Sequence, residues 1–227
     1  MTDGFETLTT TRLGDSAYAQ VATALMAGRL PPETKITIRS LAEALGTSTT
    51  PVRDAVMRLI QEGALEQRSL RDVRVPLLTP EQFREIISMR MELEGLAAFH
   101  AAARMTPEHV CAIEALIEAN EAAIKDADWD RASACNQQFH FAIIEAAEMP
   151  MLRNVLGGLW LRSGPIVAQY YRHGGRTMID RHYEIVKLLK ARDGAAARRV
   201  VAEDVDSVTE AVCAFLKAYG RDKTLKL

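Results

Sequence analysis

Four hydroxyl side chains and one guanidinium lie between residues 47 and 53, where they could bind a nucleic-acid backbone. Thr47-Ser48-Thr49-Thr50 precedes Pro51, a residue suited to the first turn of a helix, and Arg53 follows. The free N–H groups at the start of a helix bind phosphate, and hydroxyls add to that contact. An arginine one turn further on can reach a guanine edge with its two-pronged side chain. This segment therefore predicts contacts to phosphate and base.

A buried charge is predicted further along the chain, at Arg90. One helical stripe with 4-3-4-3 spacing contains Phe83, Ile87, Arg90, Glu94 and Ala97. Arginine is rarely buried without a partner. Two interpretations follow: Glu94 pairs with Arg90, or Arg90 receives an anionic effector. Arg162 is a second candidate for effector binding.

Composition narrows the function classes. The 227 residues carry a net charge of −2, so any contact with nucleic acid must come from a local basic patch. The sequence contains no P-loop, GxGxxG, GxSxG or HExxH motif, which argues against the common enzyme classes. No uncharged run approaches the roughly 18 residues of a membrane span, and the first residues lack an apolar leader. Three cysteines without CxxC spacing predict buried, reduced thiols. We expect a soluble cytoplasmic protein.

The elements that must position these residues fall into two groups. In the first group, one helix is predicted at about 15–27, with Asp15 or Ser16 as its cap, and a second at 38–45. A third helix follows Thr47-Ser48-Thr49-Thr50-Pro51 and runs to about residue 62. Two short strands at 65–67 and 73–75 flank a turn at 69–72. Two helices joined at Gly46 and followed by a hairpin predict a winged helix-turn-helix. The alternative is a helical hairpin with an unrelated β tail.

The second group is entirely helical. Amphipathic segments are predicted at about 80–104, 107–126, 128–147, 150–171, 176–192 and 194–219. Six such helices with short loops predict an antiparallel bundle. The expected fold is therefore mainly α, with a winged helix-turn-helix domain at 1–78 and a helical effector-binding and dimerisation domain at 79–227.

The run IRSLAEALGTSTTPVRDAV, residues 38–56, resembles the DNA-binding domain of GntR-family transcription regulators. That family's motif is close to R-x-L-A-E-x-L-G-V-S-R-T-P-V-R-E-A-L. The segments RMELE at 90–94, Phe139-His140 and Arg181-His182 resemble the FadR-like FCD class of C-terminal domains. Two departures stand out: Thr49 replaces an arginine that often contacts a base, and Asp72 replaces the glycine of the wing turn. Aspartate tolerates the left-handed backbone that such a turn requires.

The resemblance and the residue chemistry together predict a DNA-binding surface. Arg39 begins the second helix, and Arg71 and Arg74 lie on or beside the wing, where they suit phosphate or minor-groove contact. The predicted DNA-binding set is Arg39, Thr47, Ser48, Thr49, Thr50, Arg53, Arg71 and Arg74. For any one of these arginines, the alternative is an ordinary solvated surface charge.

The resemblance also implies a metal centre in the helical domain. The FCD class commonly holds a divalent metal with one Asp and three His. The Asp and one of the His form an Asp-x-x-x-His pair on one helix. In this chain the corresponding residues are Asn136, His140, His182 and Asp204. Such a set can bind Zn²⁺, Ni²⁺ or Mn²⁺, though less tightly than three imidazoles with a carboxylate. The alternative is a metal-free cavity in which these groups bond each other or an effector.

These observations predict a homodimeric, ligand-responsive repressor. It would bind a double-stranded DNA operator with inverted-repeat symmetry and be released or modulated by a small organic acid, with no membrane partner. One alternative is a metal-dependent enzyme that uses His140, His182 and Asp204. Another is a constitutive architectural DNA-binding protein, which would leave two-thirds of the chain without a task.

Overall fold

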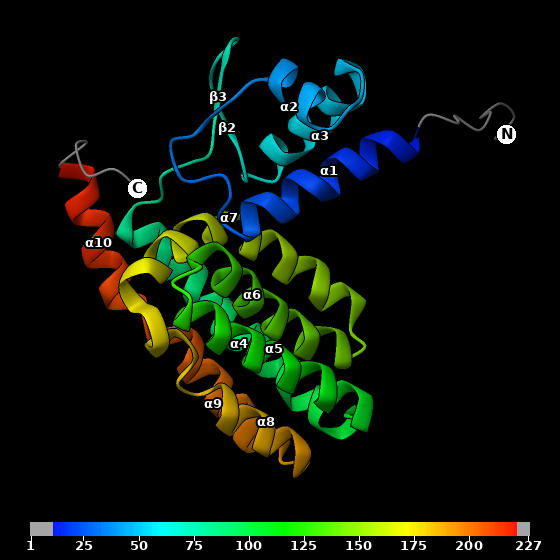
Figure 1. The fold of residues 1–227 in the computed structure, drawn as a ribbon, viewed down its shortest axis with the longest axis vertical. Helices are drawn as coiled ribbons and strands as arrows, with labels where there is room; N and C mark the ends of the chain where they lie inside the picture. Colours follow the sequence, from blue (N-terminus) through cyan, green and yellow to red (C-terminus); the bar gives the residue numbers. More distant parts are fainter. Residues whose placement is uncertain (1–10, 222–227) are drawn as a thin grey trace, which may run out of the picture.

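The computed structural model describes residues 11–221 and is largely helical (Figure 1). The first unit comprises α1 (Thr11–Met26), β1 (Lys35–Ile36), α2 (Ile38–Ala44), α3 (Thr49–Gln61), β2 (Glu66–Ser69) and β3 (Asp72–Arg74). The second comprises α4 (Pro80–Arg104), α5 (Pro107–Lys125), α6 (Trp129–Ala146), α7 (Pro150–Gly174), the 3-10 helix η1 (Gly175–Ile179), α8 (His182–Lys190), α9 (Gly194–Asp206) and α10 (Thr209–Arg221). The predicted mainly α fold, with a winged helix-turn-helix before an all-α bundle, is confirmed.

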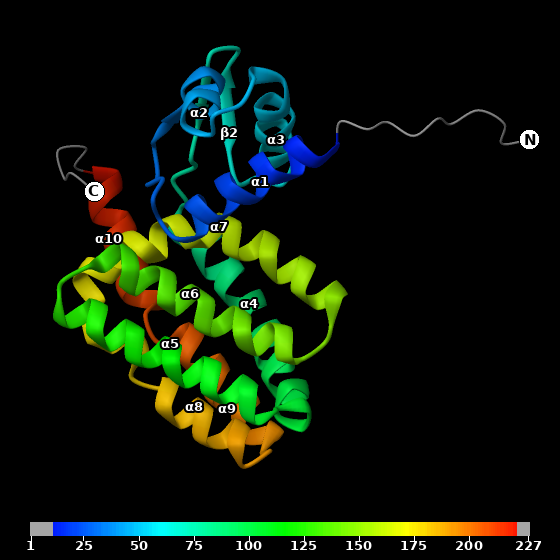
Figure 2. The same ribbon diagram turned by 45° about the vertical axis from the view of Figure 1, so that its right-hand side comes forward.

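The winged helix-turn-helix forms because local signals begin and end its short helices. Thr37 caps α2 by accepting a hydrogen bond from the Ser40 amide. Gly46 has φ +61°, a left-handed conformation that turns the chain between α2 and α3 at little cost. The three strands form an antiparallel sheet in the order β1-β3-β2. Figures 1 and 2 both show α2, α3 and the β2–β3 hairpin at the end of the molecule away from the bundle.

Several details of this unit differ from the predictions. Helix α1 begins at Thr11, so Asp15 and Ser16 lie inside it and do not cap it. The strand β1 was not predicted, because two residues are too short to show a pattern. Asp72 is the first residue of β3 and is not among the residues with positive φ; its carboxylate instead accepts a hydrogen bond from Arg74. The wing turn therefore needs no left-handed residue at that position.

In the bundle, side-chain caps set the ends of the longest helices. Thr79 and Gln82 form a capping box at the start of α4, and Thr106 and His109 form one at α5. Asp128 caps α6 by accepting a hydrogen bond from the Arg131 amide.

The buried apolar side chains form two clusters, one in the bundle and one in the winged unit. Leu161 of α7 belongs to the second, so the winged unit shares its core with a bundle helix.

The last two helices predicted from the sequence were wrong, because each is divided into two in the structure. The segment 176–192 is divided into η1 and α8, and the segment 194–219 is divided into α9 and α10. After α9, Ser207 donates a hydrogen bond from Oγ to the Asp204 carbonyl at 2.6 Å. A serine that bonds to the preceding turn competes with the continuing helix. The division places Asp204 in the last turn of α9.

Within residues 11–221, none of the helices is both long and apolar enough to cross a membrane. The sequence predicts no apolar leader at the first four residues, which lie outside the described part of the chain.

All three cysteines are free. Cys135 and Cys213 are buried as predicted, but Cys111 is exposed, which corrects the expectation for that residue.

Candidate metal centre and nucleic-acid interface

The start of α3 is open to solvent. Ser48 is the N-cap residue, and its side chain makes no capping hydrogen bond. Ser48, Thr49 and Thr50 are exposed and Thr47 is half-buried. The first N–H groups of the helix are therefore available to an anion. The opposite face of α3 is packed into the winged unit by Val52, Ala55, Val56 and Leu59.

The predicted DNA-contacting arginines differ in how free they are. Arg53 is exposed on α3. Arg39 pairs with Glu43 at 3.0 Å, but its side chain is 89% exposed, and such surface pairs are weak. Arg71 lies exposed in the turn between β2 and β3. Arg74, in contrast, donates to the Asp72 carboxylate at 2.9 Å and to the Glu33 carbonyl at 3.1 Å.

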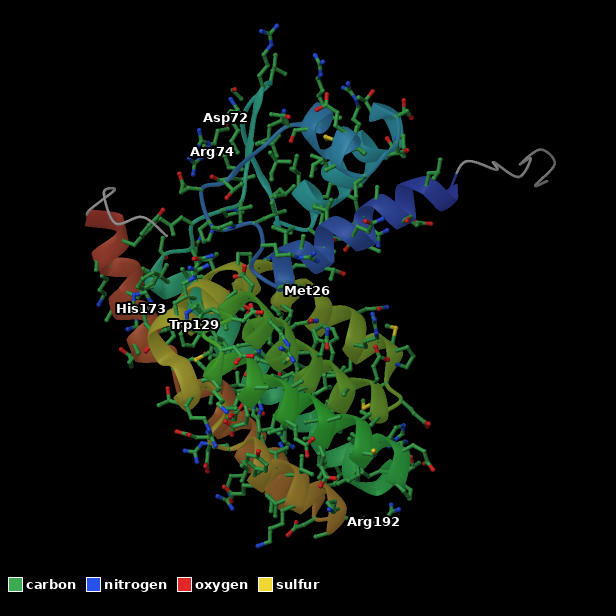
Figure 3. The ribbon with its side chains drawn as sticks, viewed as in Figure 1. Met26, Asp72, Arg74, Trp129, His173 and Arg192 are labelled. Atoms are coloured by element: carbon green, nitrogen blue, oxygen red, sulfur yellow. The ribbon has the colours of Figure 1, made fainter. Side chains whose placement is uncertain are left out.

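Arg74 therefore has a structural role in the wing. Its bond to Glu33 ties β3 to the segment before β1. Figure 3 shows Arg74 and Asp72 on the hairpin. Arg68, which the sequence did not single out, is likewise committed to ion pairs with Glu33 and Glu66. Among the predicted DNA-contacting arginines, the least constrained are thus Arg39, Arg53 and Arg71.

The structure brings the predicted metal ligands together in the bundle. His140 lies on α6, His182 begins α8 and Asp204 lies in the last turn of α9. One ligand atom of each lies within 4.8 Å of the others. Nε2 of His140 is 3.5 Å from Oδ2 of Asp204, and Nε2 of His182 is 3.7 Å from the same oxygen. Neighbouring ligand atoms in a tetrahedral zinc site with bonds of about 2.1 Å lie about 3.4 Å apart, so these separations suit a metal ion.

Unsatisfied polar atoms support the same interpretation. Asn136 lines the same small cavity as His140 and Asp204. Its buried Oδ1 has no hydrogen-bond partner, and neither ring nitrogen of His182 has one. Buried polar atoms are rarely left unpaired, and an ion is one of the partners that can satisfy them. Asn136, His140, His182 and Asp204 therefore fit a divalent cation.

The protonation state of His182 also suits a metal ligand. The ring is fully buried and stacks on Phe139, with 3.7 Å between the ring centroids. Burial lowers the pKa of His182 below its ordinary value, and this effect outweighs the opposing attraction of Asp204. The imidazole is thus neutral at physiological pH. A neutral imidazole is the form that binds a metal.

Arg90 is paired, as the first of its two interpretations proposed. Its side chain is buried, and Nε donates to Oε1 of Glu94 at 2.7 Å. The guanidinium lies 3.7 Å from the centroid of the Trp160 ring. Attraction to Arg90 and His140 overcomes the effect of burial and lowers the pKa of Glu94 to about 2. Arg90 still lines the cavity, but its main ionic partner is within the chain.

The cavity at the expected effector site is too small for an organic acid. The cavity beside Asn136, His140 and Asp204 has a volume of about 30 Å³. That volume holds an ion or a water molecule, whereas small-molecule pockets span about 300–1,000 Å³. Arg162, the second effector candidate, does not line this cavity. It donates instead from Nε to the Glu62 carbonyl at the end of α3.

Comparisons with known proteins agree with this architecture. Residues 13–75 match the model of the bacterial regulatory proteins of the gntR family, and residues 85–207 match the FCD domain. The chain is 32% identical over 183 residues to the HTH-type transcriptional regulator McbR of Escherichia coli, covering 79% of this chain and 83% of McbR. It is 29% identical over 161 residues to the "Probable D-xylose utilization operon transcriptional repressor" of Paenarthrobacter nicotinovorans, covering 71% of each.

A solved structure shows the same fold. The E. coli McbR/YncC structure superposes with a TM-score of 0.83 at 28% identity, covering 89% of this chain and 98% of that one. These relatives are transcription regulators, so the metal-dependent enzyme considered from the sequence is not favoured. The GntR helix-turn-helix, the FCD domain and the likeness to McbR together make this chain a member of the GntR family of transcription regulators, and not an enzyme.

Proposed function

We propose that this regulator binds an inverted-repeat operator as a homodimer, with one α3 helix in the major groove of each half-site. The observation that carries the proposal is the exposed start of α3, where free hydroxyls and N–H groups stand beside Arg53. In this arrangement Thr47–Thr50 hold a phosphate and Arg53 reads a guanine. Arg39 and Arg71 add backbone contacts on either side. The two-fold symmetry of a dimer would match the symmetry of the operator.

We further propose that the helical domain senses a divalent metal, of which Zn²⁺, Ni²⁺ and Mn²⁺ are the candidates. Asn136, His140 and Asp204 line the small cavity and would hold the ion there together with His182, whose Nε2 lies 3.7 Å from Oδ2 of Asp204. The bound ion would supply a positive charge to which a small carboxylate could add. Because the cavity is only about 30 Å³, the lining side chains would have to move for the acid to enter. Effector binding would therefore be accompanied by a change in the bundle. It would release DNA if the effector binds the two dimer geometries with different affinities.

We place the boundary between the DNA-binding and the helical domain at residues 78–79, within the segment between β3 and α4. The helical domain, residues 79–227, would carry the dimer contacts. A regulator of this type acts on the chromosome, and we therefore assign it to the cytoplasm.

Selection of bound duplexes from random DNA tests the central proposal. The selected sequences should contain an inverted repeat. Arg53→Ala should weaken operator binding by about 1–3 kcal/mol and relax the choice of base at one position in each half-site. Arg131→Ala is the matched control, because it removes the same charge from an exposed position on α6. Unchanged affinity and base preference in Arg53→Ala would overturn the assignment of α3 as the reading helix.

A further inference from the structure

Glu94 lies at the centre of a buried polar network that includes a proposed metal ligand. Its Oε1 accepts hydrogen bonds from Arg90 Nε at 2.7 Å and from Trp160 Nε1 at 3.0 Å. Its Oε2 lies 2.8 Å from Nδ1 of His140. Within the described residues, neither of these last two buried atoms has a hydrogen-bond partner elsewhere. The contact between Glu94 and His140 is therefore the one that can satisfy both.

This contact decides which nitrogen of His140 faces the metal ligands. A carboxylate beside Nδ1 holds the proton on that nitrogen, so that Nε2 keeps the free electron pair that can bind a metal. Nε2 is the nitrogen that faces Asp204, at 3.5 Å. Glu94 thus orients the ring for a metal, although it is not itself in the group of possible ligands, His140, His182 and Asp204.

The same network reaches one turn of α7. Arg90 donates from Nη1 to Oγ of Ser163 at 3.2 Å, and Trp160 donates to Glu94. All of these side chains are buried. Residues 160–163 of α7 are therefore bound, on their inner side, to the group that orients His140.

The outer side of that turn contacts the winged unit. Leu161 is packed into the apolar cluster of the winged unit. Arg162 donates to the Glu62 carbonyl at the end of α3, at 2.9 Å. The backbone at Gly164 approaches Met26 so closely that an added Cβ would lie 2.9 Å from the Met26 Cα. Figure 3 shows Met26 where α1 meets the bundle.

We propose that Glu94 is the positioning residue of the metal centre, and that it joins the centre through Arg90 and Ser163 to the turn of α7 that carries the winged unit. Metal binding would then change the affinity for DNA, because a shift of this turn moves α3. The inference rests on the proposed function, since it requires a metal in the bundle and DNA on α3. It adds two residues, Glu94 and Ser163, with separable roles.

Zinc affinity tests the positioning role, measured by competition with a chromophoric chelator. Glu94→Gln keeps the size of the side chain but removes its charge, and it should weaken zinc binding about 10- to 100-fold. Glu92→Gln is the matched control, because Glu92 is an exposed residue of the same helix that pairs with Arg198. The control should stay within about twofold of wild type. Wild-type zinc affinity in Glu94→Gln would overturn the role of Glu94.

A second variant guards against a folding defect, since Glu94→Gln leaves Arg90 buried without its ionic partner. Arg90→Gln with Glu94→Gln removes both charges and leaves two amides that can bond each other. Thermal unfolding followed by circular dichroism should show a cooperative transition in this double variant. Its zinc affinity should fall as far as that of Glu94→Gln, because His140 still lacks its carboxylate. Recovery of wild-type affinity would contradict the proposal.

DNA binding with and without zinc tests the link to α7, with a duplex selected by the wild-type protein. Ser163→Ala should leave zinc affinity within about twofold of wild type but remove most of the zinc-induced change in DNA affinity. Ser88→Ala is the matched control, because each serine donates to the carbonyl four residues earlier and Ser88 is exposed on α4. A full zinc effect in Ser163→Ala would overturn the link.

The wild-type protein separates the two levels of the proposal. If it binds DNA equally with and without zinc, the link fails while the function as a DNA-binding regulator stands. If it selects no DNA at all, the proposed function fails. The zinc affinities of the Glu94 variants would still decide whether Glu94 positions His140.

Discussion

Gly28 offers a direct test of how closely the winged unit sits on the bundle. It follows the end of α1 and has φ +73°. A Cβ added there would lie 2.1 Å from the Cβ of Ala168 on α7. Carbon atoms in contact lie about 3.5–4 Å apart, so Gly28→Ala cannot be accommodated without moving α1 away from α7.

The cost of Gly28→Ala has two parts. A left-handed backbone costs a residue with a Cβ about 1–2 kcal/mol. Overpacking a closed contact adds about 1–3 kcal/mol. The sum is about 2–5 kcal/mol. Gly46→Ala is the matched control, because Gly46 has φ +61° and nothing lies within 4 Å of its added Cβ. It should cost only the first part, about 1–2 kcal/mol.

Urea unfolding of wild type, Gly28→Ala and Gly46→Ala measures the difference. Ala168→Gly combined with Gly28→Ala should recover the overpacking part, after allowance for the roughly 1 kcal/mol that glycine costs inside a helix. The coupling energy of this double-mutant cycle should be about 1–3 kcal/mol. If Gly28→Ala costs no more than Gly46→Ala, the winged unit does not rest against α7 in solution as it does here.

Three further outcomes are expected. Zinc at about one hundred times its Kd should raise the free energy of unfolding by about 2.7 kcal/mol, and an equal rise in His182→Ala would contradict the assigned ligands. Burial lowers the pKa of His182 below 6.5, so the unfolded chain takes up this proton first. The metal-free protein should therefore lose stability as the pH falls below about 6.5, by up to about 1.4 kcal/mol per pH unit from this group. Urea titrations at several pH values should show that the free energy of unfolding of His182→Gln depends less steeply on pH than that of wild type. Arg71→Ala should weaken binding to all duplexes alike and reduce the slope of log K against log salt by about one, whereas a loss confined to one base position would refute a phosphate contact.

Local sequence signals determined most helix boundaries of the bundle. The predicted segment 80–104 coincides with α4, because Thr79 and Gln82 form their capping box from neighbouring residues. Pro107 and Pro150 begin α5 and α7 for the same kind of reason, since proline suits the first turn of a helix. The motif at residues 38–56 likewise contains the turn, the cap and the reading helix in one continuous run. Such features can be read along the chain because the interacting groups are three or four residues apart.

Tertiary structure decided where these helices stop and what their polar side chains meet. The ends of α8 and α9 bring His182 and Asp204 to His140, although the sequence pattern continued the helices through these points. Arg162 could be assigned to an effector from the sequence, yet it binds the end of α3, a residue one hundred positions away. Glu94 was recognised only as a partner for Arg90. Its contacts with His140 and Trp160 join three helices, and no spacing along one helix can express them.

The sequence by itself therefore determined the family, the order of the elements and the chemical types at the site. Helix caps, glycine turns and amphipathic stripes depend on near neighbours, so the chain encodes them locally. Only the tertiary structure showed that the cavity has a volume of only about 30 Å³. It also showed that one turn of α7 contacts both the network around the metal ligands and the winged unit. These features depend on how buried side chains from distant segments fill a shared volume, and packing of that kind is decided by the whole fold.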